Sequence, residues 1–183
     1  MLKKWKTLSK KYAFDHKWFK VIQETVERDD GVVIDDYFLW ENVDVVVVVA
    51  QTIEGELVLV KQYKHGVQDI VIEFAAGAID KDEDPLSASK RELREEAGYT
   101  SDDWQKLGDL YNDPSKVRGK IEVFLALNAK KTHTQSFDEN ENIEVLLKSS
   151  EEIERMIASG EIWVTGIIGA FYLAKQKLTQ IQK

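Results

Sequence analysis

Three glutamates stand at a spacing that could bind a metal ion: Glu95 and Glu96 follow Glu92 by three and four residues. On a helix this spacing places the carboxylates on one face, where like charges repel by roughly a few tenths of a kcal/mol per pair. A bound divalent cation reverses that repulsion, and Mg²⁺ and Mn²⁺ prefer carboxylate and phosphate oxygens as ligands. The cluster therefore indicates a metal site for a phosphate-containing substrate. The alternative interpretation is a solvated acidic face paired with neighbouring lysines and arginines.

The residues around these glutamates follow a longer motif. It reads glycine, five residues, glutamate, seven residues, then Arg-Glu-aliphatic-any-Glu-Glu-any-Gly-apolar. Its fixed positions in this chain are Gly77, Glu83, Arg91, Glu92, Leu93, Glu95, Glu96, Gly98 and Tyr99. This is the Nudix box, and on it the chain resembles the Nudix hydrolases. The resemblance implies a mixed sheet between helices and hydrolysis of a nucleoside diphosphate linked to another moiety.

The resemblance also implies a set of metal ligands. Glu92 and Glu96 are expected to hold Mg²⁺, for which Mn²⁺ could substitute, and Glu95 is expected to assist them. The carbonyl of Ala76, just before the box, is an expected further ligand. Glu95 is in addition a candidate for the catalytic base.

Four box positions are expected to be structural. Glu83 and Arg91 brace the loop of the box against its helix, while Gly77 and Gly98 allow tight backbone turns. The helix itself is predicted to begin at the Asp84-Pro85 pair and to end at Gly98, since Asp favours the N-cap and Pro the first helical position.

Residues outside the box resemble the branch of ADP-ribose pyrophosphatases and nucleoside-diphosphate-sugar hydrolases. Pro114 lies fifteen residues beyond Tyr99, residues 60–64 (VKQYK) resemble a Gln-x-basic strand end, and residues 72–77 (IEFAAG) resemble a Glu-x-Pro-Ala-Gly entry to the box. Two departures stand out. Ala75 replaces the proline, and the basic residues 115–120 replace a glycine and an acidic residue.

Basic side chains near these segments are suited to phosphate. The expected substrate-binding residues are Lys64, Lys116 and Arg118.

A second acidic segment, residues 138–142 (DENEN), precedes a predicted strand. By position, the resemblance implies that Glu139 is the general base and that Glu141 is an additional metal ligand. The alternative interpretation is a polar turn, because Asp and Asn favour turns on their own account. In that case the base would be sought at Glu95 and its neighbours.

Composition limits the remaining possibilities. The 183 residues, 43% hydrophobic and 32% charged, suffice for one globular core. The net charge of −8 argues against binding to nucleic acid or to an anionic membrane, and the lack of cysteine excludes disulfides and thiolate sites. The longest apolar run, residues 43–50, is too short to cross a bilayer, and the basic N-terminus does not resemble a signal peptide. A cytoplasmic location is expected.

Hydrophobic periodicity predicts an α+β fold in which a sheet is sandwiched or flanked by helices, with an N-terminal β-hairpin. The resemblance implies that this is a Nudix-like mixed β-sheet sandwiched between helices, with the hairpin as an N-terminal extension. Strands are predicted over 18–26, 32–40, 43–52, 57–63, 70–74, 121–129 and 143–147, and helices over 85–97, 151–158 and 166–180. Residues 1–42 are predicted to be a strand extension for dimerisation and substrate contact, and residues 43–183 to be the Nudix hydrolase domain.

The sequence thus predicts a homodimeric, Mg²⁺-dependent pyrophosphatase. It would split ADP-ribose or a nucleotide sugar into a nucleoside monophosphate and a sugar phosphate. Two alternatives stay open: a Nudix pyrophosphatase for a nucleoside triphosphate or a dinucleoside polyphosphate, and a catalytically weak module that senses a nucleotide.

Overall fold

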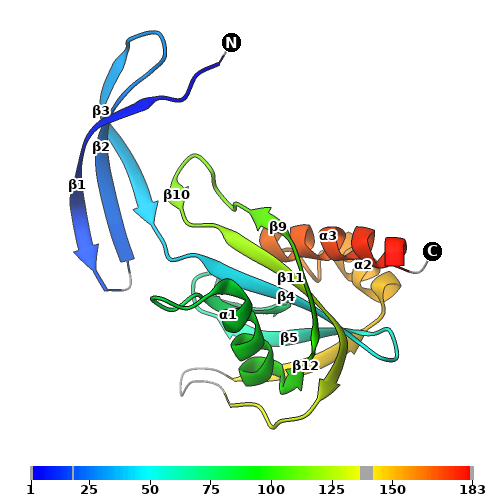
Figure 1. Cartoon of the computed structure of the whole chain (residues 1–183). Coiled ribbons are helices and arrows are strands. Elements are labelled where there is room, and N and C mark those ends of the chain that lie inside the picture. Colours follow the sequence, from blue (N-terminus) through cyan, green and yellow to red (C-terminus); the bar gives the residue numbers. More distant parts are fainter. Residues whose placement is uncertain (1, 18, 137–141, 182–183) are drawn as a thin grey trace. The chain divides into compact units, whose positions relative to one another are not determined.

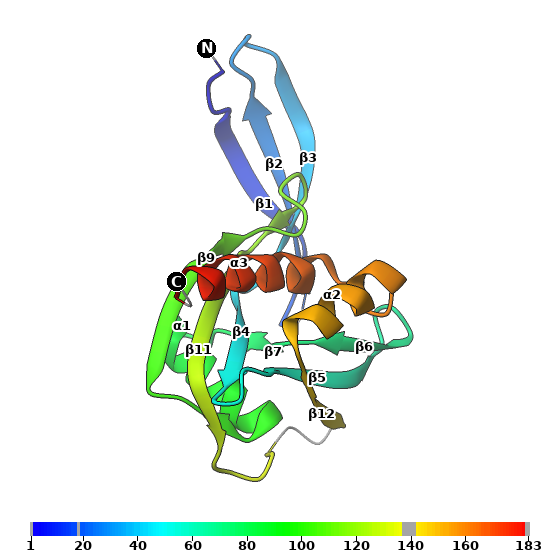
Figure 2. The same cartoon turned by 90° about the vertical axis from the view of Figure 1, so that its right-hand side faces the viewer.

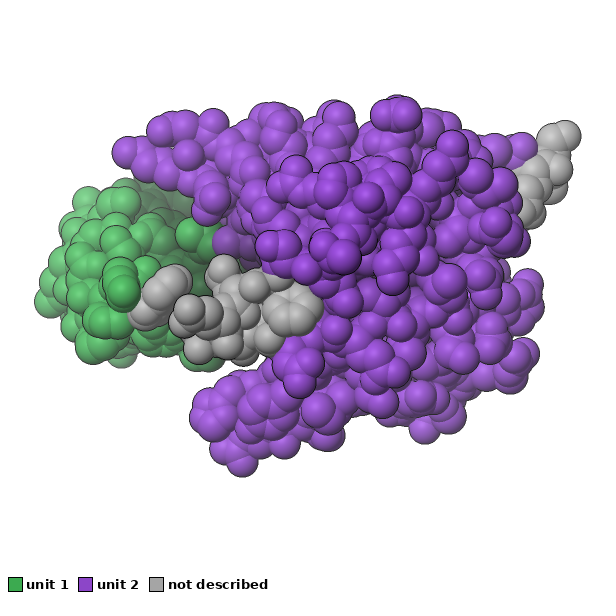
Figure 3. All heavy atoms as spheres, turned by 90° about the horizontal axis from the view of Figure 1, so that it is seen from below, with its two compact units in different colours: residues 1–43, 111–120 green, residues 44–110, 121–183 purple. Residues whose placement is uncertain are grey.

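The computed structural model of the chain describes residues 2–17, 19–136 and 142–181. The chain forms two compact units, which Figure 3 shows in different colours. The first unit holds residues 1–43 and 111–120, and the second unit holds residues 44–110 and 121–183. Each unit is built on its own sheet, and Figure 1 labels the longer strands of both.

The first unit is a four-stranded sheet in the order β1-β2-β3-β10. Its strands are β1 (Lys6–His16), β2 (Phe19–Glu27), β3 (Val33–Glu41) and β10 (Val117–Arg118). The first three are antiparallel neighbours, and β10 runs parallel to β3. The predicted hairpin of β2 and β3 is confirmed. Strand β1 is not predicted, because every one of its residues is exposed and no alternation of buried and exposed positions marks it.

The second unit is a mixed sheet in the order β12-β5-β4-β11-β8, with β6 beside β5, β7 beside β4 and β9 beside β11. Its strands are β4 (Val45–Thr52), β5 (Leu57–Lys64), β6 (Asp69–Glu73), β7 (Ala75–Ala78), β8 (Tyr99–Thr100), β9 (Asp103–Leu110), β11 (Ile121–Lys131) and β12 (Ile143–Lys148). Within this second sheet, only β4 and β11 among the described strands pair in parallel. The short strands β7 and β8 and the longer strand β9 are not among those predicted.

Helices cover both faces of this second sheet. One face packs against α2 (Ser150–Ser159) and α3 (Thr165–Ile181), which lie across it in Figure 2. The other face packs against α1 (Pro85–Glu92) and the π-helical segment η1 (Leu93–Ala97). Strand β4 is buried on both faces, as its run of valines predicts. The predicted sandwich of a mixed sheet between helices is therefore confirmed.

The box helix differs from the regular helix that the sequence predicts. Asp84 does cap its start, accepting hydrogen bonds from the backbone N–H groups of Leu86 and Ser87, and Gly98 ends it in a left-handed conformation with φ of 76°. Between Glu92 and Gly98, however, the backbone widens into the π-helical η1, a feature that often marks functional sites. None of the helices in the described ranges is both long and apolar enough to span a bilayer.

Candidate active site on the box helix

Arg91 ties the box helix to the loop that precedes it. Its Nε and Nη2 atoms donate to the two carboxylate oxygens of Glu83 at 3.0 and 2.9 Å, and Nη2 also donates to the carbonyl of Ala78 at 2.9 Å. The guanidinium lowers the pKa of the Glu83 carboxyl, which also accepts a hydrogen bond from the backbone N–H of Asp80. The geometry agrees with the bracing role expected for both residues.

Glu92 lies between this arginine and strand β7. Its Oε1 atom accepts a hydrogen bond of 2.6 Å from Arg91 Nη1, and its side chain is only 12% exposed. A Cβ atom built on Gly77 would stand 2.0 Å from the same oxygen. Position 77 therefore needs glycine because the Glu92 carboxylate occupies the space of a side chain.

Glu96 also reaches strand β7, from the next turn of the helix. It is 3% exposed, and its Oε2 atom accepts a hydrogen bond of 2.9 Å from the backbone N–H of Ala76. The carboxylates of Glu92 and Glu96 thus both lie against the short stretch from Ala76 to Gly77. The structure brings together three of the predicted metal-binding residues.

Glu95 is placed differently from the other two glutamates. Its side chain is 34% exposed and lies 3.2 Å from Arg94 Nη2 and 3.5 Å from Arg91 Nη1. Two guanidinium groups therefore hold this carboxylate at the more open side of the helix.

These donors suit a hard divalent cation. Within the described residues, no three His, Cys, Asp or Glu side chains form a group that could hold a metal ion. The Glu92 and Glu96 carboxylates, both mostly buried, nevertheless lie against the stretch from Ala76 to Gly77, and these carboxylates and the carbonyl of Ala76 offer oxygen atoms. Oxygen donors of this kind match the preference of Mg²⁺, which keeps several water or phosphate ligands besides those of the protein.

The predicted substrate-binding residues fall in different units. In the second unit, Lys64 Nζ lies 3.7 Å from Glu73 Oε2, and burial raises the pKa of the Glu73 carboxyl while Lys64 partly offsets the rise. In the first unit, Arg118 donates from Nη2 to both oxygens of the buried Glu24 at 2.9 and 3.0 Å. Lys116 lies over the ring of Tyr37, 4.8 Å from its centroid. Neither Glu24 nor Glu73 is predicted from the sequence, because an acidic residue in a strand gives no local sign of a basic partner.

Two further predicted residues, Glu139 and Glu141, lie outside the described residues. Near that segment the structure adds Gln135, whose side chain donates to the backbone of the box helix. A single glutamine in a polar stretch gives no sequence signal of such a contact.

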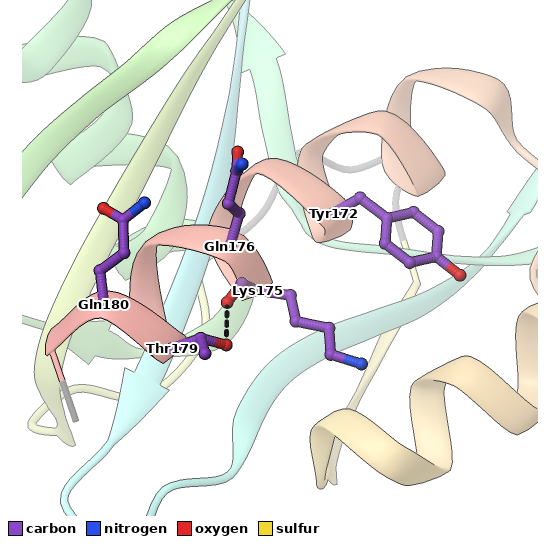
Figure 4. A pocket seen from close by; sticks show the side chains of 5 residues that line it. All are labelled: Tyr172, Lys175, Gln176, Thr179 and Gln180. Carbon is purple, nitrogen blue, oxygen red and sulfur yellow. Dashed lines mark hydrogen bonds between the residues drawn. The ribbon is translucent and has the colours of Figure 1, made fainter. Parts of the chain in front are cut away.

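A pocket of about 630 Å³ lies along α3, on the opposite face of the sheet from η1. Figure 4 shows its lining residues, Tyr172, Lys175, Gln176, Thr179 and Gln180. The lining contains no carboxylate, and the ammonium of Lys175 pairs with Glu154 at 2.6 Å. This pocket therefore lacks the groups for metal-assisted phosphate chemistry, and we place the active site at the box helix.

Comparison with known families decides the assignment. The model of the NUDIX domain matches residues 41–162, which is more than half of the chain. The chain belongs to the Nudix family. A model described as the nucleoside diphosphate sugar hydrolase N-terminal domain matches residues 5–40 of this Nudix protein.

Relatives of this Nudix protein extend over nearly its whole length. It is 29% identical over 180 residues to the ADP-ribose pyrophosphatase of Bacillus subtilis (strain 168), with 97% of each chain covered. It is 26% identical over 174 residues to the methanol dehydrogenase activator of Bacillus methanolicus, with 94% of each chain covered. The crystal structure of an ADP compounds hydrolase matches with a TM-score of 0.86 at 22% identity, over 98% of this chain and 97% of that chain. The predicted family, fold and enzyme class are confirmed: the chain is a Nudix hydrolase.

Proposed function

We propose that this Nudix hydrolase cleaves the pyrophosphate bond of ADP-ribose or of a nucleotide sugar, releasing a nucleoside monophosphate and a sugar phosphate. The observation that carries the proposal is the similarity to an ADP-ribose pyrophosphatase over 97% of both chains. The match of residues 5–40 to the N-terminal domain of nucleoside diphosphate sugar hydrolases supports the same substrate class. Nucleoside triphosphates and dinucleoside polyphosphates are the competing substrates.

In this proposal Glu92, Glu96 and the Ala76 carbonyl hold Mg²⁺, and Glu95 assists them. Bound Mg²⁺ supplies positive charge to the pyrophosphate oxygens and makes a bound water more acidic. Arg91 keeps the Glu92 carboxylate in place through its 2.6 Å hydrogen bond. The backbone N–H of Ala76 does the same for Glu96 at 2.9 Å.

The general base is proposed to be Glu139, with Glu141 as a further ligand and Glu95 as the alternative base. A base must lie within hydrogen-bond reach of the attacking water, and its loss costs typically 10²–10⁴-fold in turnover, by general experience with such groups. Lys64, Lys116 and Arg118 are proposed to contact the phosphates. For Lys64 this requires only a shift from its loose contact with Glu73, whose atoms are 3.7 Å apart.

We further propose that the active species is a homodimer located in the cytoplasm. The support for a dimer is a cluster of exposed rings on the first unit. Phe14 and Trp40 are 53% and 51% exposed, and the ring of Phe19 lies 6.2 Å from the first and 5.6 Å from the second. A contiguous exposed apolar patch of this kind is typical of an interaction surface.

The net charge of −8 supports a small-molecule substrate rather than nucleic acid.

The test is a substrate panel with the purified protein and Mg²⁺. ADP-ribose, GDP-mannose, a nucleoside triphosphate and a diadenosine polyphosphate are compared by chromatography of the products. We expect the fastest turnover with ADP-ribose or the nucleotide sugar, giving the monophosphate and the sugar phosphate. Faster release of pyrophosphate from the triphosphate would overturn the substrate assignment.

A substitution tests the site itself. Glu96→Gln keeps the size of the side chain but removes one charge from the metal site, so turnover should fall by two or more orders of magnitude, roughly, while the fold is kept. The matched control is Glu161→Gln, an exposed glutamate in the α2–α3 connection, which should keep wild-type turnover. Near-normal activity of Glu96→Gln would contradict the proposed metal site.

A further inference from the structure

The C-terminal end of the box helix is capped by a segment distant in sequence. The backbone N–H groups of Thr132 and His133 donate to the carbonyl of Gly98 at 3.0 and 3.1 Å, and the N–H of Ser136 donates to the carbonyl of Glu95 at 2.9 Å. The last carbonyls of a helix have no partner within the helix itself. Residues 132–136 therefore supply hydrogen bonds that the helix end cannot make alone.

Gln135 completes this cap with its side chain. Its Nε2 atom donates to the carbonyl of Glu96 at 2.6 Å and to the carbonyl of Ile143 at 3.0 Å, and the group is partly buried. A side-chain amide has two N–H donors, so these two bonds use both of them. Ile143 is the first residue of β12 and is itself buried. One amide group thus links the end of the box helix to the sheet.

These contacts fix Glu96 from two sides. The Ala76 N–H holds its carboxylate, and the Gln135 amide holds its backbone carbonyl. The carbonyl lies in the wider π-helical segment η1, where the regular α-helical hydrogen-bond pattern is interrupted. Loss of the amide would remove the hydrogen bond from Gln135 to the partly buried carbonyl of Glu96. The turn that carries Glu96 would then relax towards other hydrogen-bond donors.

We propose that Gln135 is a positioning residue of the active site, which acts through the backbone of Glu96 to hold its carboxylate in the geometry that binds the metal. This rests on the proposed role of Glu96 as a metal ligand. Gln135 touches neither metal nor substrate in this proposal. Its effect should therefore appear in metal affinity, in the way that outer-shell partners of metal ligands act.

The test compares Gln135→Met with the wild type in a titration with Mn²⁺ alone, in which free Mn²⁺ is followed by electron paramagnetic resonance. Methionine keeps the length of the side chain but donates no hydrogen bond. We expect the Mn²⁺ dissociation constant to rise about 10-fold, at the lower end of outer-shell effects. The Mg²⁺ concentration for half-maximal hydrolysis should rise with it, and excess Mg²⁺ should restore most of the turnover.

Gln51→Met is the matched control. Gln51, near the end of β4, also donates its amide to a backbone carbonyl, that of Gly55 at 3.3 Å in the turn before β5, and this hydrogen bond is exposed. This variant should keep wild-type Mn²⁺ affinity. Gln135→Asn serves as a second variant, because its shorter side chain cannot span both carbonyls, and it should weaken Mn²⁺ binding in the same direction.

The outcomes separate this proposal from the one on which it rests. A lower melting temperature with unchanged Mn²⁺ affinity in both Gln135 variants would show a merely structural role and overturn the proposal, while the proposed function would stand. A wild-type protein that binds no Mn²⁺ and hydrolyses nothing would overturn both. Weaker Mn²⁺ binding in the Gln135 variants, with the Gln51 control unchanged, would support the positioning role of Gln135.

Discussion

At the scale of single residues, Arg91 makes more of the contacts that hold the site together than its place in the motif suggests. Its guanidinium donates hydrogen bonds to two carboxylates and one carbonyl from three separate stretches of the box. A planar group with several donors can make these bonds at once, whereas an ammonium cannot. Arginine at this position therefore fixes the loop, the helix and Glu92 together.

Arg91→Lys tests this role. The variant keeps the charge but loses the fork of donors, and we expect the free energy of unfolding at pH 7 to fall by about 1–3 kcal/mol. The lowered pKa of Glu83 means that its ion pair stabilises the fold above the usual pKa of about 4.5 and is lost as the pH falls through the lowered value. The difference in the free energy of unfolding between variant and wild type should therefore narrow below about pH 4. Urea denaturation at several pH values measures it.

The control for this prediction is Arg94→Lys. The Arg94 side chain is 47% exposed and contacts Glu95 at 3.2 Å, so its loss should cost less than about 0.5 kcal/mol. Equal and small losses of unfolding free energy in Arg91→Lys and Arg94→Lys would show that Arg91 does not brace the box.

The sequence anticipates the site best where a side chain acts through its own chemistry. Glu92 and Glu96 are predicted from type and spacing, and the structure brings them together at β7. Gly77 is expected to allow a tight turn, but it lies in strand β7 and leaves room for the Glu92 carboxylate instead. Glu24, which pairs with Arg118, and Gln135, which caps the helix, are not predicted. Their partners are 94 and 39 residues away in the chain, and no local pattern records such a contact.

At the scale of elements, periodicity predicts the long strands and helices but not their irregular parts. The valines of β4 and the capping residues of α2 identify those elements directly. The π-helical η1 is missed because its residues are ordinary helix formers, and the residues 132–136 that cap its end lie far along the chain. Strand β9 is missed because most of its residues are half-buried at both faces.

Gly98→Ala tests how closely residues 132–136 pack on the helix end. The left-handed backbone alone costs a non-glycine residue about 1 kcal/mol or more. A Cβ atom at Gly98 would in addition stand 2.4 Å from the carbonyl oxygen of His133, a backbone atom that cannot swing aside. We expect the loss of unfolding free energy to exceed that of Gly160→Ala.

Gly160 is a matched control because it ends α2 with φ of 80° but has nothing within 4 Å of the added Cβ atom. Urea denaturation of the two variants isolates the cost of the contact from the cost of the backbone. Equal losses would mean that residues 132–136 do not press against the helix end.

At the scale of the whole molecule, the proposed homodimer makes a prediction about mass. Wild-type protein should sediment at about 42 kDa, twice the chain mass of 21.0 kDa. The double variant Phe14→Lys, Trp40→Lys places charge in the exposed ring cluster and should shift the protein towards the monomer. Tyr172→Lys is the control, since Tyr172 is similarly exposed on α3. A dimer that persists in the double variant would exclude the ring cluster as its interface.

The first unit is built from two stretches of chain, and this has a consequence for synthesis on the ribosome. Residues 111–120 supply β10 and Arg118, so the sheet begun by residues 1–43 lacks both until the 75 residues from 44 to 118 have been added. At 5–20 residues per second, that delay is about 4–15 s. The second unit also lacks β11, the parallel partner of β4, until residues 121–131 follow. Both sheets therefore gain a missing strand between residues 117 and 131, although the second sheet still awaits β12. A chain released before residue 111 would expose two unfinished sheets at once.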